Sequence, residues 1–328
     1  MPASEPTARR RVLVTGGGGF LGAAVVRALA AHPGVELVVS ADIRPADVHP
    51  SDGTLTPVVQ ARCDVRDARA VASLIAAHRV DTVAHLAAMM FPGTAGENLA
   101  YQVDVIGARN VLAACVAQGV RRIVVPSSAA AYGYHADNPE RVTEDDPLRG
   151  NDDFTFSRHK RLVEELLADY RQRHPELEQV VLRIDTILGP GVSNRITALW
   201  DHRGVLALRG SDSPFGFVWV DDVVGAVAVA VTGEATGVFN VVGDGCLTVR
   251  DIARHLGKRT FALPVGLLAF VLRVGHALHL TDNGPERIAF LRHRPVLDNT
   301  RLKQVLGYTP RLTSAEAFDA YLASKRQR

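Results

Sequence analysis

The sequence predicts an α/β fold: a doubly wound parallel sheet of the Rossmann type, followed by a smaller C-terminal α/β lobe. Short apolar runs alternate with longer amphipathic stretches through the first half of the chain. Strands buried on both faces and separated by helices specify this architecture. The expected strands are residues 12–14, 37–40, 58–61, 82–86, 123–125 and 180–182, and the expected helices are residues 21–31, 68–78, 100–118 and 157–174.

The second lobe is expected where the rhythm of the chain changes. After Gly189-Pro190 the elements become shorter and are interrupted by glycine and proline. A helix that opens at Asp221-Asp222, whose carboxylates cap it, and a strand at residues 238–242 are expected to return to the sheet. The expected units are therefore a sheet domain of residues 9–185 with 217–243, and a lobe of residues 186–216 with 244–328.

Composition excludes several classes of protein. Hydrophobic residues make up 47% and charged residues 22% of the 328 residues, which excludes a disordered or fibrous chain. Lys and Arg are scattered among Asp and Glu, so we expect no nucleic-acid partner. There is no signal-peptide core, and the most apolar run, residues 261–272, is too short to cross a bilayer. We expect a cytoplasmic protein with no membrane partner, in which that run is a packed helix.

The three cysteines, Cys63, Cys115 and Cys246, have neither metal-ligand spacing nor an even count. We expect reduced, buried thiols and no metal site.

A glycine-rich loop, Thr15-Gly16-Gly17-Gly18-Gly19-Phe20-Leu21-Gly22, joins the first expected strand to the first expected helix. The glycines at 16, 19 and 22 allow a tight turn and a close approach of a pyrophosphate to the helix N-terminus. A glycine-rich loop alone is a weak signal. Because a strand precedes this loop and a helix follows it, the loop predicts a dinucleotide-binding site. The sheet domain is thus the expected dinucleotide-binding domain, and the second lobe the expected substrate-binding lobe.

Asp42 ends the second expected strand, twenty residues beyond Gly22. A carboxylate there accepts hydrogen bonds from both ribose hydroxyls of NAD and repels the 2′-phosphate of NADP. NAD is therefore favoured, although the Arg44 guanidinium keeps NADP open as the less favoured cofactor.

Further motifs follow the later strands: Asp64-Val65, His85-Leu86-Ala87-Ala88, Ser127-Ser128-Ala129-Ala130-Ala131-Tyr132-Gly133, Leu182-Arg183 with Gly189-Pro190, and Leu306-Gly307-Tyr308. With these motifs the chain resembles the extended short-chain dehydrogenase/reductase family, which includes sugar-nucleotide epimerases and dehydratases. The resemblance spans nearly the whole chain. It implies that Asp64 and Val65 flank the adenine, that Leu86, Ala87 and Ala88 line the cofactor, and that Lys160 holds the nicotinamide ribose. It also implies a homodimer through the helices at residues 100–118 and 157–170.

One departure from the family pattern concerns the catalytic acid. The family handles protons with a Ser or Thr, a Tyr and a Lys, and the resemblance implies that Ser128 and Lys160 are two of these. The tyrosine position is Phe156, four residues before Lys160 and on the same helix face. Phenylalanine keeps the shape of the ring and removes the acid. Tyr321 and Lys325 repeat the spacing in the last expected helix, where we interpret it as chance.

Other departures concern the substrate. Sugar-nucleotide members carry an Arg that binds the diphosphate where this chain has Phe215, and Trp219 and Asp104 replace a frequent His and Asn. A UDP-sugar substrate is therefore less favoured. The residues Met89, Met90, Trp200, Phe215 and Trp219 instead suggest an apolar pocket for a small substrate, with core packing as the alternative.

Three groups are candidates to replace the lost acid. Tyr132 and Tyr134 follow the serine loop, and Asp185 follows the sixth strand, where the ligand crevice of this fold lies. His159 points off the face shared by Phe156 and Lys160 and is interpreted as a surface or dimer-interface residue.

Three functions remain open: an enzyme that uses NAD on a small, partly apolar substrate without the usual acid, a non-redox isomerase or cyclase with a structural dinucleotide, and a silent dinucleotide sensor. The first is favoured because Ser128, Lys160 and the glycine loop are retained together.

Overall fold

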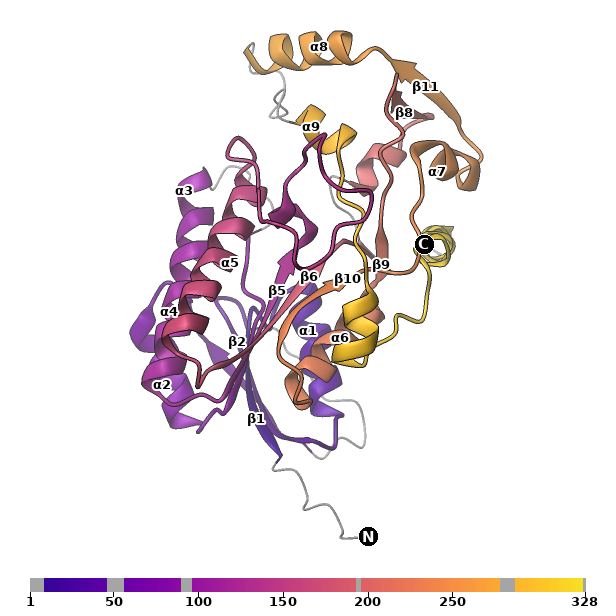
Figure 1. The fold of residues 1–328 in the computed structure, drawn as a ribbon. Coiled ribbons are helices and arrows are strands. Elements are labelled where there is room, and N and C mark those ends of the chain that lie inside the picture. Colours follow the sequence, from indigo (N-terminus) through magenta and orange to yellow (C-terminus); the bar gives the residue numbers. More distant parts are fainter. Residues whose placement is uncertain (1–8, 46–55, 90–95, 193–195, 278–286, 327–328) are drawn as a thin grey trace.

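The computed structural model describes residues 9–45, 56–89, 96–192, 196–277 and 287–326, and its centre is a seven-stranded parallel sheet (Figure 1). The strand order is β10-β6-β5-β4-β1-β2-β3, so the direction of winding reverses between β1 and β4. This confirms the predicted Rossmann-type architecture. The strands are β1 Arg10–Thr15, β2 Val35–Asp42, β3 Val58–Arg62, β4 Thr82–His85, β5 Arg122–Ser128, β6 Glu178–Ile184 and β10 Gly237–Val241.

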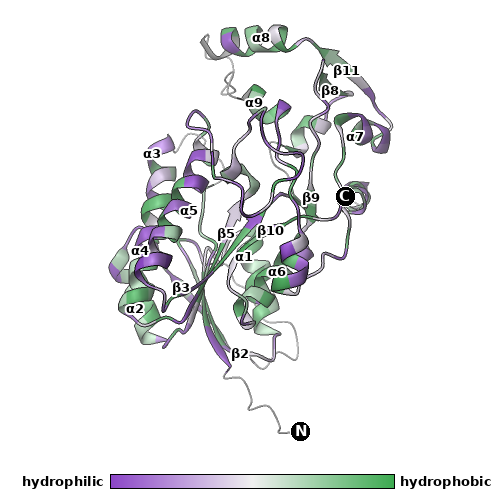
Figure 2. Cartoon of the chain, in the orientation of Figure 1, coloured by the Kyte–Doolittle hydropathy of each residue, from purple (hydrophilic) through white to green (hydrophobic). Residues whose placement is uncertain are grey.

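Helices cover both faces of the sheet. Helices α1 (Phe20–Ala30) and α6 (Val220–Thr232) pack on one face, and α2 (Ala68–Ala77), α4 (Gly107–Ala117) and α5 (Thr155–Arg173) lie on the other (Figure 1). Alternate residues of one strand serve the two faces: Val12 and Val14 join the cluster with α1 and α6, whereas Leu13 joins the cluster with α2 and α4. Figure 2 shows hydrophobic residues concentrated in these strands and in the helices beside them.

The expected helix at residues 100–118 is interrupted. It consists of α3 (Gly96–Tyr101), a π-helical turn over Gln102–Ile106 and α4. A π-helical turn adds one residue to the helical ladder and is common at functional sites. Among the described residues, the run Gly96–Ala117 is also the one helix with the length and hydropathy of a membrane span, and 44% of its apolar window is buried. This is a weak signal, because core helices of other proteins pass the same test.

The C-terminal part of the chain builds two small parallel pairs, β7 (Thr186–Leu188) with β9 (Phe217–Trp219) and β8 (Gly204–Leu208) with β11 (Arg259–Leu263). The predicted return of the chain to the sheet is confirmed by α6 and by β10, which pairs with β6. The predicted cap is wrong: the N-cap of α6 is Trp219, and Asp221 and Asp222 lie in the first helical turn without capping it. The assignment of residues to two domains stays a prediction. The remaining elements are α7 Val249–His255, α8 Val265–Ala277, α9 Arg287–Arg292, α10 Ser314–Arg326, the short turns Ala129–Tyr132 and Thr197–Trp200, and a π-turn at Leu302–Leu306.

The prediction of a packed helix at residues 261–272 is correct for the helix over residues 265–272, which lie in α8, and wrong for the residues before it and for the packing. Residues before Pro264 form β11, because they pair with β8, and α8 begins only after that proline. The side chains of Phe261 and Phe270 are 59% and 64% exposed. The apolar run therefore exposes large side chains, although Leu268 within it is buried, and α8 lies at the top of the view in Figure 1.

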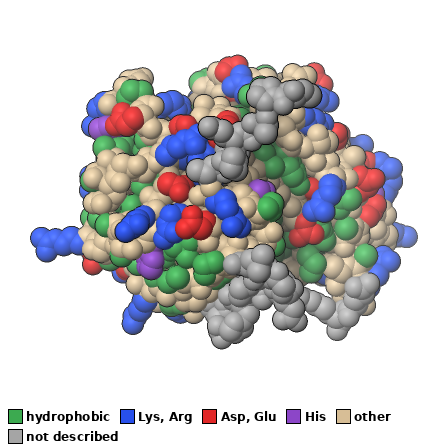
Figure 3. All heavy atoms as spheres, turned by 90° about the horizontal axis from the view of Figure 1, so that it is seen from below, with side chains coloured by type: hydrophobic (Ala, Val, Ile, Leu, Met, Phe, Trp, Pro, Cys, Tyr) green, Lys and Arg blue, Asp and Glu red, His purple; other side chains and the backbone are tan. Residues whose placement is uncertain are grey.

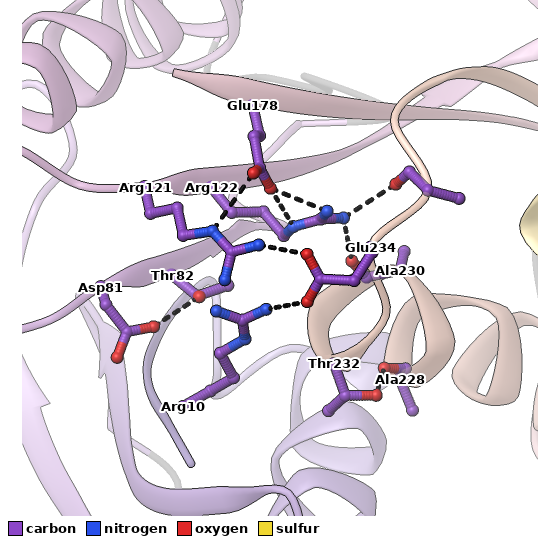
Figure 4. A network of polar contacts seen from close by, with 11 residues as sticks. Arg10, Asp81, Thr82, Arg121, Arg122, Glu178, Ala228, Ala230, Thr232 and Glu234 are labelled. Carbon is purple, nitrogen blue, oxygen red and sulfur yellow. Dashed lines mark hydrogen bonds and ion pairs between the residues drawn. The ribbon is translucent and has the colours of Figure 1, made fainter. Parts of the chain in front are cut away.

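Ion pairs join the amino-terminal ends of the strands, opposite the expected ligand edge (Figure 4). Arg122, whose side chain is fully buried, pairs with Glu178 at 2.8 Å and donates to the carbonyl oxygens of Ala230 and Ala235. Arg10 and Arg121 both pair with Glu234 after α6. This network ties β1, β5 and β6 to the end of α6. On the face seen from below, Lys and Arg are interspersed with Asp and Glu (Figure 3).

Candidate functional site

The glycine loop packs too closely for side chains. Gly16 has φ +72°, and a Cβ there would lie 2.7 Å from the backbone nitrogen of Ala87. A Cβ on Gly22 would lie 2.0 Å from the carbonyl oxygen of Gly16. Both positions therefore require glycine, and the loop brings the N-terminus of α1 against the end of β1.

The N-terminus of α1 fits an anionic group. Gly19 caps it without a side-chain hydrogen bond, and its first turn holds no acidic residue. Its first backbone N–H groups therefore have no capping partner within the helix or from a capping side chain. Phe20 is 55% exposed, and Leu21 is half-buried beside it.

Asp42 lies at the same edge. Its carboxylate accepts hydrogen bonds from the backbone N–H of Gly18 at 3.2 Å and of Arg44 at 2.9 Å. The carboxylate is thus fixed beside the loop, where the prediction places the ribose.

The other predicted cofactor residues converge on this edge. Leu86 donates its backbone N–H to the carbonyl oxygen of Thr15, which brings Ala87 beside Gly16 and leaves Ala88 exposed. Val65 is buried. Asp64 pairs with Arg66, which holds the pKa of that carboxyl below its usual range.

Lys160 and Phe156 share one face of α5. The Lys160 ammonium lies 5.7 Å from the centroid of the Phe156 ring and donates a hydrogen bond to the carbonyl oxygen of Pro126 at 3.2 Å. Burial of the ammonium lowers the pKa of Lys160, and the Asp104 and Glu164 carboxylates oppose that shift. The structure thus places the ring without a hydroxyl beside the cation that the family pattern pairs with a phenol.

Ser128 ends β5, two residues beyond Pro126. Its Oγ accepts a hydrogen bond from the backbone N–H of Ala130 at 3.2 Å, which leaves the hydroxyl proton free to be donated. Ser157, the neighbour of Phe156, donates to the carbonyl oxygen of Ala130 at 2.6 Å. This fully buried bond holds the start of α5 against the serine loop, and no local pattern in the sequence pointed to it.

The interpretation of His159 as a surface residue is wrong. Its side chain is 1% exposed, and its Nδ1 hydrogen bonds at 3.0 Å to the carboxylate of Asp104. The π-helical turn directs Asp104 inward, where its other oxygen accepts the N–H of Met89 at 2.7 Å. His85 is also buried: it hydrogen bonds to Thr15 at 2.7 Å, and burial and the nearby Lys160 lower its pKa to about 4.

Tyr132 is engaged within the protein. Its hydroxyl donates to Asn240 at 2.8 Å and accepts from Arg183 at 2.7 Å, and burial raises its pKa. Arg183 in turn pairs with Glu164 at 2.7 Å. These bonds support a structural role for Tyr132 below the site.

Asp185 follows β6 and is next to Ile184, the cross-strand partner of Ser128. One carboxylate oxygen accepts the N–H of Thr186 at 2.7 Å, whereas the other is buried without a hydrogen-bond partner. Burial raises the pKa of Asp185 to about 7. A Cβ on Gly216 would lie 2.2 Å from the unpartnered oxygen, so the glycine makes room for the carboxyl group.

The predicted apolar residues are divided between pocket and core. Trp200 and Phe215 belong to an aromatic core with Phe217 and Phe318, and Trp200 and Phe215 also line a small apolar pocket. Trp219 packs against that core, Met89 is half-buried, and Met90 lies outside the described residues. Sequence reasoning missed Arg294, which stacks on Phe215, because nothing in its local sequence marks it.

In the part of the chain that the structure describes, no three His, Cys, Asp or Glu side chains form a group that could hold a metal ion. Burial raises the pKa of the Cys63 thiol to about 11 and that of Cys115 to about 12. Cys246 is exposed, which corrects the expectation that all three thiols are buried.

A profile of the NAD dependent epimerase/dehydratase family matches residues 12–242. The chain belongs to this family. An uncharacterised protein of Mycobacterium tuberculosis is 30% identical over 329 residues, 98% of this chain and 86% of its own length. The N-acetyl-alpha-D-glucosaminyl-diphospho-ditrans,octacis-undecaprenol 4-epimerase of Escherichia coli O157:H7 is 30% identical over 272 residues, 78% of this chain and 77% of its own length. The Escherichia coli epimerase supports the resemblance drawn from the motifs.

The fold is likewise shared with solved structures. The UDP-glucose 4-epimerase of Thermus thermophilus in complex with NAD is 25% identical with a TM-score of 0.71, over 96% of this chain and 99% of that one. The Thermotoga maritima UDP-glucose 4-epimerase with UDP-glucose reaches a TM-score of 0.73 at 21% identity, over 97% and 99%. The second likeness shows the fold alone.

Proposed function

We propose that the protein is an NAD-dependent enzyme of the epimerase/dehydratase family that acts on a small, partly apolar substrate without a tyrosine acid. One observation carries the proposal: Lys160 and Ser128 converge at the end of β5, while the ring beside the Lys160 ammonium is Phe156. The family's NAD-dependent epimerases and dehydratases support an enzyme.

The residues at the sheet edge fit NAD. The N-terminus of α1 would receive the pyrophosphate, and Asp42 would accept hydrogen bonds from the ribose hydroxyls. Its negative charge favours NAD over NADP, and the NAD complex of the Thermus thermophilus epimerase supports that preference. When bound, NAD supplies a hydride acceptor at its nicotinamide ring.

The chain's own groups would orient the substrate and handle its proton. The Ser128 hydroxyl can donate a hydrogen bond to a substrate oxygen, because it accepts from Ala130. Lys160 supplies a positive charge at the same place. Phe156 cannot exchange a proton, so the proton passes to Asp185, to water, or to the substrate itself.

Two observations favour other functions. The Escherichia coli relative acts on a diphosphate-linked sugar, which favours a sugar-diphosphate epimerase as the second candidate. The missing acid favours a non-redox isomerase or a silent dinucleotide sensor. A homodimer through the faces of α4 and α5 and a cytoplasmic location stay predictions.

Titration of the purified protein with NAD and NADP tests the cofactor assignment. NAD is expected to bind more tightly than NADP, and Asp42→Ala is expected to reduce that difference at least tenfold. Asp319→Asn, an exposed carboxylate on α10, is the matched control and should change neither affinity. Equal affinities of the wild-type protein for the two dinucleotides would contradict the role of Asp42.

Hydride transfer is then followed by the nicotinamide absorbance with a panel of small carbonyl and hydroxyl compounds. Conversion of UDP-glucose is followed by product analysis, because an epimerase returns the hydride to the sugar and leaves the net absorbance unchanged. Turnover of a small compound supports the proposal, and turnover of UDP-glucose supports the second candidate. Tight NAD binding with no turnover across the panel supports the sensor. Isomerisation of a substrate with no transient reduction of the bound nicotinamide in a single turnover supports the non-redox function.

A further inference from the structure

Arg294 presents a charged group that the protein leaves unpaired. It follows α9, and its guanidinium lies between two rings, with Cζ 3.2 Å from the centroid of Phe215 and 4.2 Å from that of Phe290. Its Nε donates to the carbonyl oxygen of Phe290, and its backbone N–H donates to Ser213. Both terminal nitrogens are buried and have no hydrogen-bond partner among the described residues.

Two further polar groups border this guanidinium. Asp185 and Tyr134 both act on the pKa of Arg294, which burial lowers to about 9. Asp185 nevertheless forms no ion pair with Arg294, although both side chains are described, and its own Oδ2 is buried without a partner. Tyr134 is 9% exposed and packs against Phe154 and Phe290. We call Tyr134, Asp185 and Arg294 the Arg294 cluster.

Unpaired buried charge is costly, and two other buried arginines that the structure describes, Arg122 and Arg183, each pair with a carboxylate. Arg183 bonds to Glu164, Tyr132 and a carbonyl oxygen, and Arg122 bonds to Glu178 and two carbonyl oxygens. An unmade hydrogen bond to a buried charged group costs roughly 2 kcal/mol or more. Two free terminal nitrogens on Arg294 and a free oxygen on Asp185 therefore indicate groups kept for a ligand.

The cluster lies in the crevice of the fold. Asp185 follows Ile184, which pairs across the sheet with Ser128, so the cluster begins beside the proposed catalytic serine. Its surroundings are apolar: Phe154, Phe215 and Phe290 contribute the rings, and Phe215 also lines the apolar pocket of the second lobe. A ligand held by Arg294 would thus reach towards Ser128 from an apolar enclosure.

We propose that the Arg294 cluster binds the carboxylate of the substrate. The inference rests on the proposed function, since it assigns the substrate class of the same site. The two free terminal nitrogens form a fork that matches two carboxylate oxygens. One guanidinium balances the single charge of a monoanion and would leave the further charge of a diphosphate unpaired. Tyr134 and a protonated Asp185 can each donate a further hydrogen bond to the ligand.

The test is calorimetric titration of the NAD-saturated full-length protein with benzoate, and separately with benzamide, inorganic phosphate and UDP. Benzoate is expected to bind, and benzamide is expected to bind at least tenfold more weakly. Arg294→Met is expected to weaken benzoate binding at least tenfold, and Arg294→Lys to weaken it less, because lysine keeps the charge and loses the fork. The matched control is Arg250→Met, an arginine whose side chain is 73% exposed, which should leave benzoate affinity unchanged.

Three results would overturn the proposal. The first is no benzoate binding to the wild-type protein, and the second is the same benzoate affinity in the wild type, Arg294→Met and Arg294→Lys. The third is UDP binding that is tighter than benzoate binding and is lost in Arg294→Met. If Arg294→Met does not fold, Arg294→Lys still decides. NAD affinity is measured first in every variant. Failure to bind NAD would contradict the proposed function, and benzoate binding to the NAD-free protein would then still test the cluster.

Discussion

Restoring the missing phenol with Phe156→Tyr tests how Lys160 acts on this site. The Lys160 ammonium lies 5.7 Å from the ring centroid. At that separation and an effective dielectric constant of about 20, one positive charge stabilises a phenolate by about 3 kcal/mol. The ionisation constant of the new phenol should therefore be roughly a hundredfold larger than that of an exposed tyrosine.

The assay is an ultraviolet titration of tyrosinate, taken as the difference between the variant and the wild-type protein. Phe270→Tyr is the matched control, since that ring on α8 is 64% exposed. A second control, Lys160→Met in the Phe156→Tyr background, should return the phenol to ordinary behaviour. If the phenols introduced at 156 and 270 titrate alike, Lys160 does not act on this position and the reasoning is refuted.

Phe156→Tyr is also expected to change the rate of catalysis. A positioned general acid contributes about a hundredfold to ten-thousandfold in rate. Phe156→Tyr should therefore accelerate reduction of simple carbonyl compounds by a factor in that range, measured by the nicotinamide absorbance. An ionised phenol in the right place with no gain in rate would contradict a hydride-transfer geometry around Ser128.

Three further predictions concern stability. Gly22→Ala should unfold at a lower temperature and lose NAD binding, because its Cβ would lie 2.0 Å from the Gly16 carbonyl oxygen. The control is Gly266→Ala on α8, whose Cβ would meet nothing within 4 Å, and it should keep both the unfolding temperature and NAD binding. Glu178→Gln should lower the free energy of unfolding by about 2 kcal/mol in urea titrations, since it leaves the buried Arg122 without its carboxylate. Asp185 has a folded pKa of about 7 against an ordinary 3.8, so the folded state binds more protons and the wild type should lose stability as the pH rises between these values. Asp185→Asn should not show that loss, and parallel stability curves for the two proteins would contradict the shift.

The sequence was sufficient for the dinucleotide edge because each of its signals is local. The loop from Gly16 to Gly22 joins a strand to a helix by its own spacing, and Asp42 ends the next strand. Short apolar runs separated by amphipathic stretches predict parallel strands, whose carboxyl ends share one edge, so the loop and Asp42 are expected together. The pairing of Phe156 with Lys160 was predictable for the same reason, since both lie on one helix.

Groups that depend on tertiary contacts were not predictable. His159 was expected at the surface because helical spacing alone turns it away from Lys160, and its burial depends on Asp104, which an added residue in the helical ladder turns inward. Arg294 is more than a hundred residues from Asp185 in the chain. Only the packing of the second lobe brings the two close enough for Asp185 to act on the pKa of Arg294.

Phe156 and Phe215 stand at two positions where the family resemblance implies polar groups, and a cation lies against each ring. Lys160 lies 5.7 Å from the centroid of Phe156, but the phenol that it would activate is absent. At Phe215 the implied arginine is absent from the chain position, yet the Arg294 guanidinium lies 3.2 Å from that ring. We therefore infer that the site has changed its acid but kept a cation, delivered from another segment. Phe215→Arg would remove the ring on which Arg294 stacks, so it should weaken benzoate binding, and UDP binding gained in this variant would show that the site still suits a diphosphate.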